Sequence, residues 1–184
     1  MARLNTAHVA EFQAVKELCY RGLDSGRLRE RVGDRLARHL GLSSYCFGAN
    51  DPSTALPVHS VSVGLDPSAM QVFFELILST PSLDFGPWVA RRQRAARLED
   101  LVSDVDQDPY MTEILRPSGL RYDVQVACVG GDWSWGHLCL RRRQRDEPFA
   151  GHEVRFLDAL VPHLTAGLRS AASRAALAAS PASP

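Results

Sequence analysis

The sequence contains almost no lysine and no excess of charge of either sign. Lys16 is the single lysine among 21 basic residues, and 21 acidic residues balance them to a net charge of +0. Proteins that are drawn to nucleic acids or membrane surfaces by their overall field carry an imbalance of charge. The composition therefore argues against such binding by this chain as a whole.

Long apolar runs are missing as well. No run approaches the roughly 18 apolar residues that can cross a membrane. The start, MARLNTAHVAEFQ, lacks the apolar core of a signal peptide. We therefore expect a cytoplasmic protein with no membrane contact. With 184 residues, of which 45% are hydrophobic, the chain is long enough for one globular domain.

Cysteine is scarce, and the usual catalytic motifs are absent. The four cysteines lack a CxxC spacing, which predicts neither a zinc site nor a disulfide scaffold, and we expect reduced, mostly buried thiols. Six histidines are dispersed, and no G-x-S-x-G or Cys/His signature occurs. The sequence therefore predicts a protein that is not an enzyme and that needs no metal or cofactor. The cysteines are Cys19, Cys46, Cys128 and Cys139.

What the sequence does contain is a predicted β-hairpin. Two apolar runs, over residues 124–130 and 135–140, flank the turn residues Gly130-Gly131-Asp132. Neither strand is polar along one whole face, so we expect helices to cover both sides of the sheet, or one face to line a cavity. Gly136, inside the second strand, either lets another backbone approach or leaves room for a ligand.

Before the hairpin, apolar residues at three- to four-residue spacing predict helices over residues 6–23 and 28–40, which together form one long N-terminal arm. Residues 45–48 and 58–64 have the patterns of strands. Asp66-Pro67 predicts the start of a further helix with proline at its first position.

The stretch from residue 79 to residue 119 is the least regular. It predicts a helix over 89–97, a short strand over 98–101 and a short helix that begins at Asp108-Pro109. Long connections that carry aromatic residues are often lids or pocket walls.

After the hairpin, the arginine-rich residues 141–148 are predicted to form a solvated turn rather than a phosphate site. An amphipathic helix then begins near His152. The alanine-rich and then Pro/Ser-rich tail is typical of a helix end that becomes a linker to a further segment.

Several short motifs match those of a known family, and the order of elements matches too. The chain resembles the GAF-like sensor domains at the N-termini of LuxR-type transcriptional regulators. The resemblance spans nearly the whole chain, but the helix-turn-helix of that family is absent from it. The matching residues are Trp135-Gly136 with the strand end at Arg141, the P-x-L-x-x-x-L-R pattern of Pro162, Leu164, Leu168 and Arg169, Asp51-Pro52, and YMTEILRP from Tyr110 to Pro117.

The resemblance implies an α+β fold, with a GAF-like central antiparallel sheet, the N- and C-terminal helices on one face, and a cavity on the other face under the irregular connection. Residues 1–41 would be a helical arm of the same domain, 42–172 the sensor domain and 173–184 a linker-like tail. The implied function is a small-molecule-sensing regulatory domain, which couples ligand occupancy to an attached DNA-binding segment that this chain lacks.

The concentration of aromatic residues in the connection favours an apolar or aromatic ligand, because no phosphate-binding motif is present. The expected pocket wall consists of Tyr45, Phe47, Phe73, Trp88, Tyr110, Met111, Ile114, Cys128 and Trp135. Each of these residues is also explained as plain core. The alternatives are a ligand-free dimerisation module, a redox enzyme like the GAF-type methionine sulfoxide reductases, and a haem protein with His59 or His137 as axial ligand.

We also expect a homodimer that forms through the arm and the last helix. Its interface would be an apolar stripe, unless this stripe packs on the chain's own sheet. The stripe consists of Leu157, Val161, Leu164 and Leu168 with Val15 and Leu36.

Overall fold

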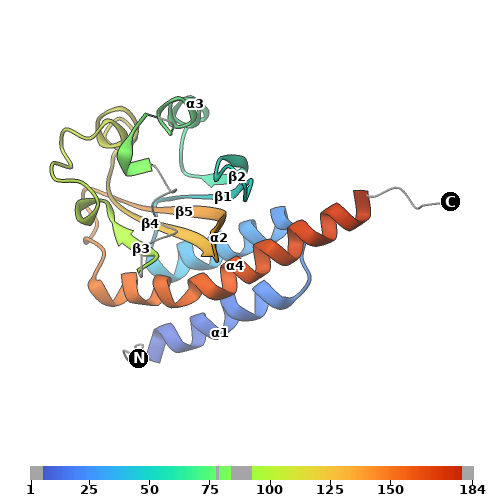
Figure 1. Cartoon of the computed structure of the whole chain (residues 1–184). Helices are drawn as coiled ribbons and strands as arrows, with labels where there is room; N and C mark the ends of the chain where they lie inside the picture. Colours follow the sequence, from blue (N-terminus) through green and yellow to red (C-terminus); the bar gives the residue numbers. More distant parts are fainter. Residues whose placement is uncertain (1–5, 78, 84–92, 180–184) are drawn as a thin grey trace.

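The computed structural model describes residues 6–77, 79–83 and 93–179 (Figure 1). Their centre is a five-stranded antiparallel sheet with the strand order β2-β1-β5-β4-β3. The helices α1, α2 and α4 cover one face of the sheet, and α3 lies with short helical segments over the other face. The expected α+β fold, with the terminal helices on one face, is confirmed.

The five strands follow from the alternating and apolar patterns of the sequence. They are β1 (Ser44–Asn50), β2 (Pro57–Val63), β3 (Ala95–Arg97), β4 (Leu120–Gly130) and β5 (Trp133–Arg143). The predicted hairpin joins β4 to β5, and Gly131 adopts φ +61° in its turn, a conformation that glycine adopts without strain. A side chain at Gly136 would lie 2.5 Å from the carbonyl oxygen of Gly48, so this glycine lets a backbone approach.

The two predicted helices of the N-terminal arm pack antiparallel to each other, so they do not form one long arm. Helix α1 (Thr6–Tyr20) ends before Gly22, whose φ is +71°, and the side chain of Asp24 caps α2 (Ser25–Leu40). His8 near the start of α1 contacts His39 near the end of α2, which fixes the antiparallel direction. The turn before α2 therefore breaks the arm into a helical pair.

Helix α4 (Gly151–Ala179) begins where Glu153 accepts a hydrogen bond of 2.8 Å from the backbone N–H of Ala150. Its apolar side chains, together with those of α1 and α2, fill the core between the helices and the sheet. All six residues of the predicted dimer stripe are buried there, so the stripe packs within one chain and offers no interface. Beyond Ala171 the helix is exposed and projects past the sheet (Figure 1).

The connection between β2 and β4 matches the prediction at its helices and differs from it at residues 95–100. Helix α3 (Pro67–Leu76) forms as expected, with Asp66 as its cap, and a one-turn helix covers Met111–Leu115. Residues 95–97 form a strand instead of the end of a helix, because small alanines pair there with β4 at a buried sheet edge. Leu98–Asp100 is a 3-10 helix instead of a strand.

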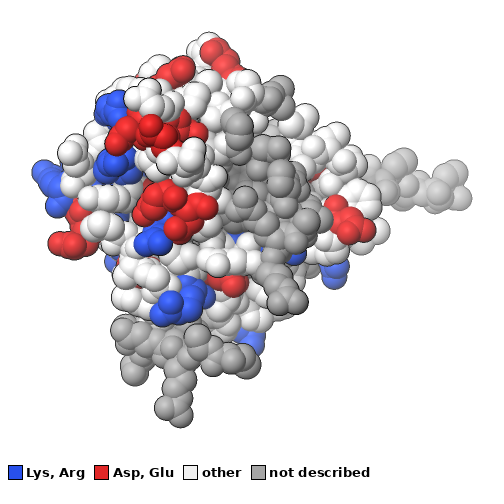
Figure 2. Space-filling model, turned by 60° about the vertical axis from the view of Figure 1, so that its left-hand side comes forward, with Lys and Arg blue, Asp and Glu red and all other residues white. Residues whose placement is uncertain are grey.

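Charge is mixed on the outside, in keeping with the net balance of the sequence. Figure 2 shows basic and acidic side chains interspersed over the described part of one face. The ion pairs of the described residues include Arg97 with Asp100 and Arg116 with Asp106. None of the helices in the described ranges is long and apolar enough to cross a membrane.

Candidate functional site

The nine predicted pocket residues do not share one face of the sheet. Phe73, Tyr110, Met111 and Ile114 lie together over the face that α3 and the connection cover. Alternation along β1 and β4 turns Tyr45, Phe47 and Cys128 toward the helices on the opposite face, where Trp135 is half-buried. The remaining residue, Trp88, lies outside the described residues.

The connection-side face of the sheet carries buried polar side chains, which we call the polar layer. Its members are Ser44, Asn50, Asp123, Gln125, His137 and Arg141, and each is at most 6% exposed. Above them lies an apolar covering layer, which consists of Phe73, Leu83, Leu98, Tyr110, Met111, Ile114 and Leu115. Buried polar groups cost free energy unless they are hydrogen-bonded, so a polar layer under an apolar cover requires an explanation.

Strand register sets the order of the polar layer. Ser44, Arg141 and Asp123 form one row across β1, β5 and β4, because Arg141 is paired with both of the other residues. Two residues further along the strands, Gln125 is paired with Cys139. The next row contains His137. The sheet therefore holds these groups at fixed separations.

A fully buried ion pair forms the first row. The guanidinium Nε of Arg141 lies 3.4 Å from Oδ1 of Asp123. It also donates a hydrogen bond of 2.7 Å to the hydroxyl of Tyr110, which in turn donates one of 3.2 Å to Asp123 Oδ1. Burial raises the pKa of Asp123 to about 6, although the positive charge of Arg141 opposes this shift. Tyr110 thereby ties the covering layer to the polar layer.

His137 belongs to a second chain of hydrogen bonds, which ends at Ser134 beside the turn of the hairpin. Its Nδ1 lies 2.9 Å from Oδ1 of Asn50, whose amide nitrogen donates a hydrogen bond of 2.9 Å to Ser134. Gly48 makes room for the imidazole, because a side chain there would lie 2.2 Å from the ring of His137. Burial, and then the charges of Arg141 and Arg29, lower the pKa of His137 to about 3, so the ring is neutral.

Several polar atoms of this face have no hydrogen-bond partner in the described part of the chain. They are Arg141 Nη2, Asp123 Oδ2, both amide atoms of Gln125 and the hydroxyl of Ser62 on β2. Gln125 lies near enough to Asp123 to lower the pKa of its carboxyl, but no hydrogen bond of acceptable geometry joins the two. Each buried unpaired group costs about 1–3 kcal/mol. The face therefore holds donors and acceptors that a bound molecule could satisfy.

Apart from His137, which the sequence offers as a haem ligand, the sequence does not predict the residues of the polar layer as a site. Strand alternation places Gln125 on the opposite face from Val124 and Val126, and this polar position was the available sign of the site. The pocket prediction instead followed the aromatic residues of the connection. Arg141 was assigned to a solvated turn, whereas β5 continues to Arg143 and buries it completely. Arg142, beside it, is also buried and pairs with Glu153 at 2.6 Å.

The four cysteines are buried free thiols, as predicted. Burial raises the pKa of every one of them, to about 12 for Cys19. Thiols with raised pKa values react slowly, because the thiolate is the nucleophile. Among the described residues, no cluster of three His, Cys, Asp or Glu side chains could hold a metal ion.

No protein-family model matches the sequence, and a search of curated proteins finds no match. Solved structures, however, share the fold over nearly the whole chain. The GAF domain of an Acinetobacter phosphoenolpyruvate-protein phosphotransferase is similar with a TM-score of 0.60 and 9% identity, over 94% of this chain and 99% of that one.

CepR2 from Burkholderia cenocepacia, an N-acylhomoserine lactone dependent LuxR family transcription factor, is similar with a TM-score of 0.59 and 16% identity, over 94% of this chain and 99% of that one. The free methionine-R-sulfoxide reductase of Neisseria meningitidis is similar with a TM-score of 0.55 and 11% identity, over 95% and 96% of the two chains. The chain therefore has the GAF-like fold that sensor domains of LuxR-type regulators share.

Proposed function

We propose that the chain is a cytoplasmic, non-catalytic sensor domain of a transcriptional regulator, which binds a small molecule between the polar layer and the covering layer. The observation that carries the proposal is the set of unpaired, fully buried polar atoms of Asp123, Gln125 and Arg141. Buried polar atoms in folded proteins nearly always have a hydrogen-bond partner, so these atoms call for partners from outside the chain. The N-acylhomoserine lactone dependence of CepR2, which shares the fold, supports a ligand in this kind of domain.

The ligand that suits this layer has a polar head group, in addition to the apolar or aromatic character expected from the sequence. The charges of Asp123 and Arg141 balance each other, which favours a neutral head group with hydrogen-bond donors and acceptors. The covering layer, with Phe73, Met111 and Ile114, offers apolar contacts to the rest of the molecule.

Helix α4 is the element suited to pass ligand occupancy to a DNA-binding segment beyond this chain. It packs on β4 and β5, and Leu168 lies close to Gly136 on the hairpin. The exposed last turns of α4 project away from the sheet (Figure 1). Buried thiols with raised pKa values support a non-catalytic role over that of a reductase.

The test is native mass spectrometry of the freshly purified protein, compared with its denatured mass. We expect a bound small molecule that is lost on denaturation, and the same spectrum counts the subunits. A protein that carries no excess mass, and that gains no thermal stability from any compound of a metabolite library, would contradict the proposal. The polar layer would then be purely structural and the domain an interaction module.

A further inference from the structure

Gln125 differs from the other residues of the polar layer because both its hydrogen-bond donor and its acceptor are unpaired. It is 0% exposed, and neither its amide oxygen nor its amide nitrogen has a hydrogen-bond partner among the described residues. Its neighbours across the sheet are Cys139 and Ala96, and Ala127 follows on the same face of β4. These side chains are small and contain no oxygen or nitrogen atom that could pair with the carboxamide of Gln125.

A side-chain carboxamide presents a C=O acceptor and an N–H donor side by side in one plane, whichever way the amide is turned. A single partner satisfies both atoms only if its own donor and acceptor lie on one edge in the complementary order. A trans amide of an open chain does not meet this condition, because its N–H and C=O point in opposite directions. A cis amide within a ring does meet it.

We propose that the ligand is a planar heterocycle with a cis-amide edge, such as a lactam, an imide or a nucleobase, and that this edge pairs with Gln125. The inference rests on the proposed function and adds the chemical class of the ligand. Glutamine uses the same two amide atoms to pair with N6 and N7 of adenine in DNA, so one edge of a planar ring can satisfy a side-chain carboxamide.

The surroundings of Gln125 fit such a ring. Asp123 and Arg141 lie one strand repeat away, about 6.6 Å along the sheet, where a second polar atom of a fused ring system would meet Asp123 Oδ2 or Arg141 Nη2. The hydroxyl of Ser62 is three strand spacings from Gln125, about 14 Å, and belongs to the far end of the layer. Phe73 and Tyr110 of the covering layer provide aromatic faces.

Three matched probes test the inference on the unmodified protein by NMR titration of its backbone amides. Isoquinolin-1-one has a cis-amide edge, its N-methyl derivative lacks the donor, and isoquinoline lacks both amide atoms. We expect isoquinolin-1-one to bind at least about tenfold more tightly than either analogue, because an unpaired buried amide atom costs roughly a factor of ten or more in affinity. The shifted resonances should include those of β4 around Gln125.

The variant Gln125→Leu should bind all three probes with equal affinity, while Gln93→Leu, at an exposed glutamine before β3, should discriminate as the unmodified protein does. Equal binding of the three probes to the unmodified protein, discrimination that survives in Gln125→Leu, or no binding of any probe would each overturn the inference. If native mass spectrometry still finds a ligand in that case, the proposed function stands. If it finds none, both fail.

Discussion

At the scale of single residues, the buried ion pair between Arg141 and Asp123 is the strongest constraint on substitution. Replacing Arg141 with methionine leaves the carboxyl of Asp123 buried without its cation. We expect Arg141→Met to lower the free energy of unfolding by about 3–5 kcal/mol, measured by urea denaturation. The double variant Arg141→Met with Asp123→Leu should recover part of this loss. If the single and double variants are equally unstable, the pair is not the origin of the cost.

Gly136 provides a second prediction at this scale. A side chain at this position would lie 2.5 Å from the carbonyl oxygen of Gly48 and 2.8 Å from Leu168 on α4. We expect Gly136→Ala to lower the free energy of unfolding by about 1–3 kcal/mol, because strand and helix must move apart. The control is Gly26→Ala in the first turn of α2, which should be neutral or slightly stabilising. Similar losses in both variants would refute this explanation.

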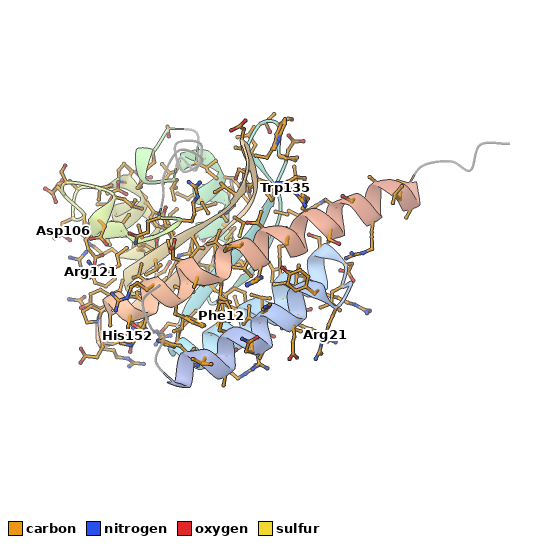
Figure 3. All side chains as sticks on the ribbon, turned by 60° about the horizontal axis from the view of Figure 1, so that its bottom comes forward. Phe12, Arg21, Asp106, Arg121, Trp135 and His152 are labelled. Atoms are coloured by element: carbon orange, nitrogen blue, oxygen red, sulfur yellow. The ribbon has the colours of Figure 1, made fainter. Side chains whose placement is uncertain are left out.

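At the scale of elements, three histidines join the three helices of one layer. Nδ1 of His8 on α1 lies 2.8 Å from Nε2 of His39 on α2. The centre of the His8 ring lies 5.2 Å from the centre of the His152 ring on α4. Phe156 stacks on His8 at 4.6 Å. Figure 3 shows His152 near the start of α4, beside α1. Burial, followed by the charges of His39 and His152, lowers the pKa of His8.

This cluster predicts a loss of stability in mild acid. Because the folded pKa of His8 is lowered from 6.5, the unfolded chain binds its proton first, so the stabilisation is present above pH 6.5 and is lost as the pH falls through that value. The negative charge of Glu153 acts to raise the pKa of His8, but this carboxylate is already paired with Arg142. The slope of the unfolding free energy is at most about 1.4 kcal/mol per pH unit for each proton.

The variant His8→Phe keeps the ring contact with Phe156 and removes the titrating group, so we expect a shallower decline of stability between pH 7 and pH 5. Urea denaturation at several pH values measures this, and hydrogen exchange should localise the acid-induced opening to the first turns of α1. His59→Gln, at an exposed residue of β2, is the control. An unchanged pH profile in His8→Phe would exclude the cluster as the cause.

The elements themselves were largely predictable, because each has a local signal. Asp66-Pro67 marks the start of α3, and Gly131 marks the turn of the hairpin. The short strand at Ala95–Arg97 was not predictable, because two alanines carry no strand preference and only pairing with β4 places them in the sheet. The site was not predictable for a similar reason. The side chains that lie beside Gln125 on its face of the sheet depend on the register of four paired strands.

At the scale of the whole molecule, the apolar stripe of α4 belongs to the core of one chain. Leu164 is 1% exposed between α4 and the sheet. We expect Leu164→Ala to lower the free energy of unfolding by about 2–5 kcal/mol, as for other buried leucines. Sedimentation should give the same oligomeric state for the variant and the unmodified protein. A change of oligomeric state without a loss of stability would restore the stripe as a dimer interface.

We propose that the polar layer exists for a bound molecule and not for the stability of the empty fold. The most direct measurement is the free energy of unfolding of the ligand-free Gln125→Leu variant. We predict an increase of about 1–3 kcal/mol, because leucine removes two buried atoms that lack partners. A decrease of similar size would mean that Gln125 is already hydrogen-bonded within the empty fold, and it would contradict a ligand-binding role of the polar layer.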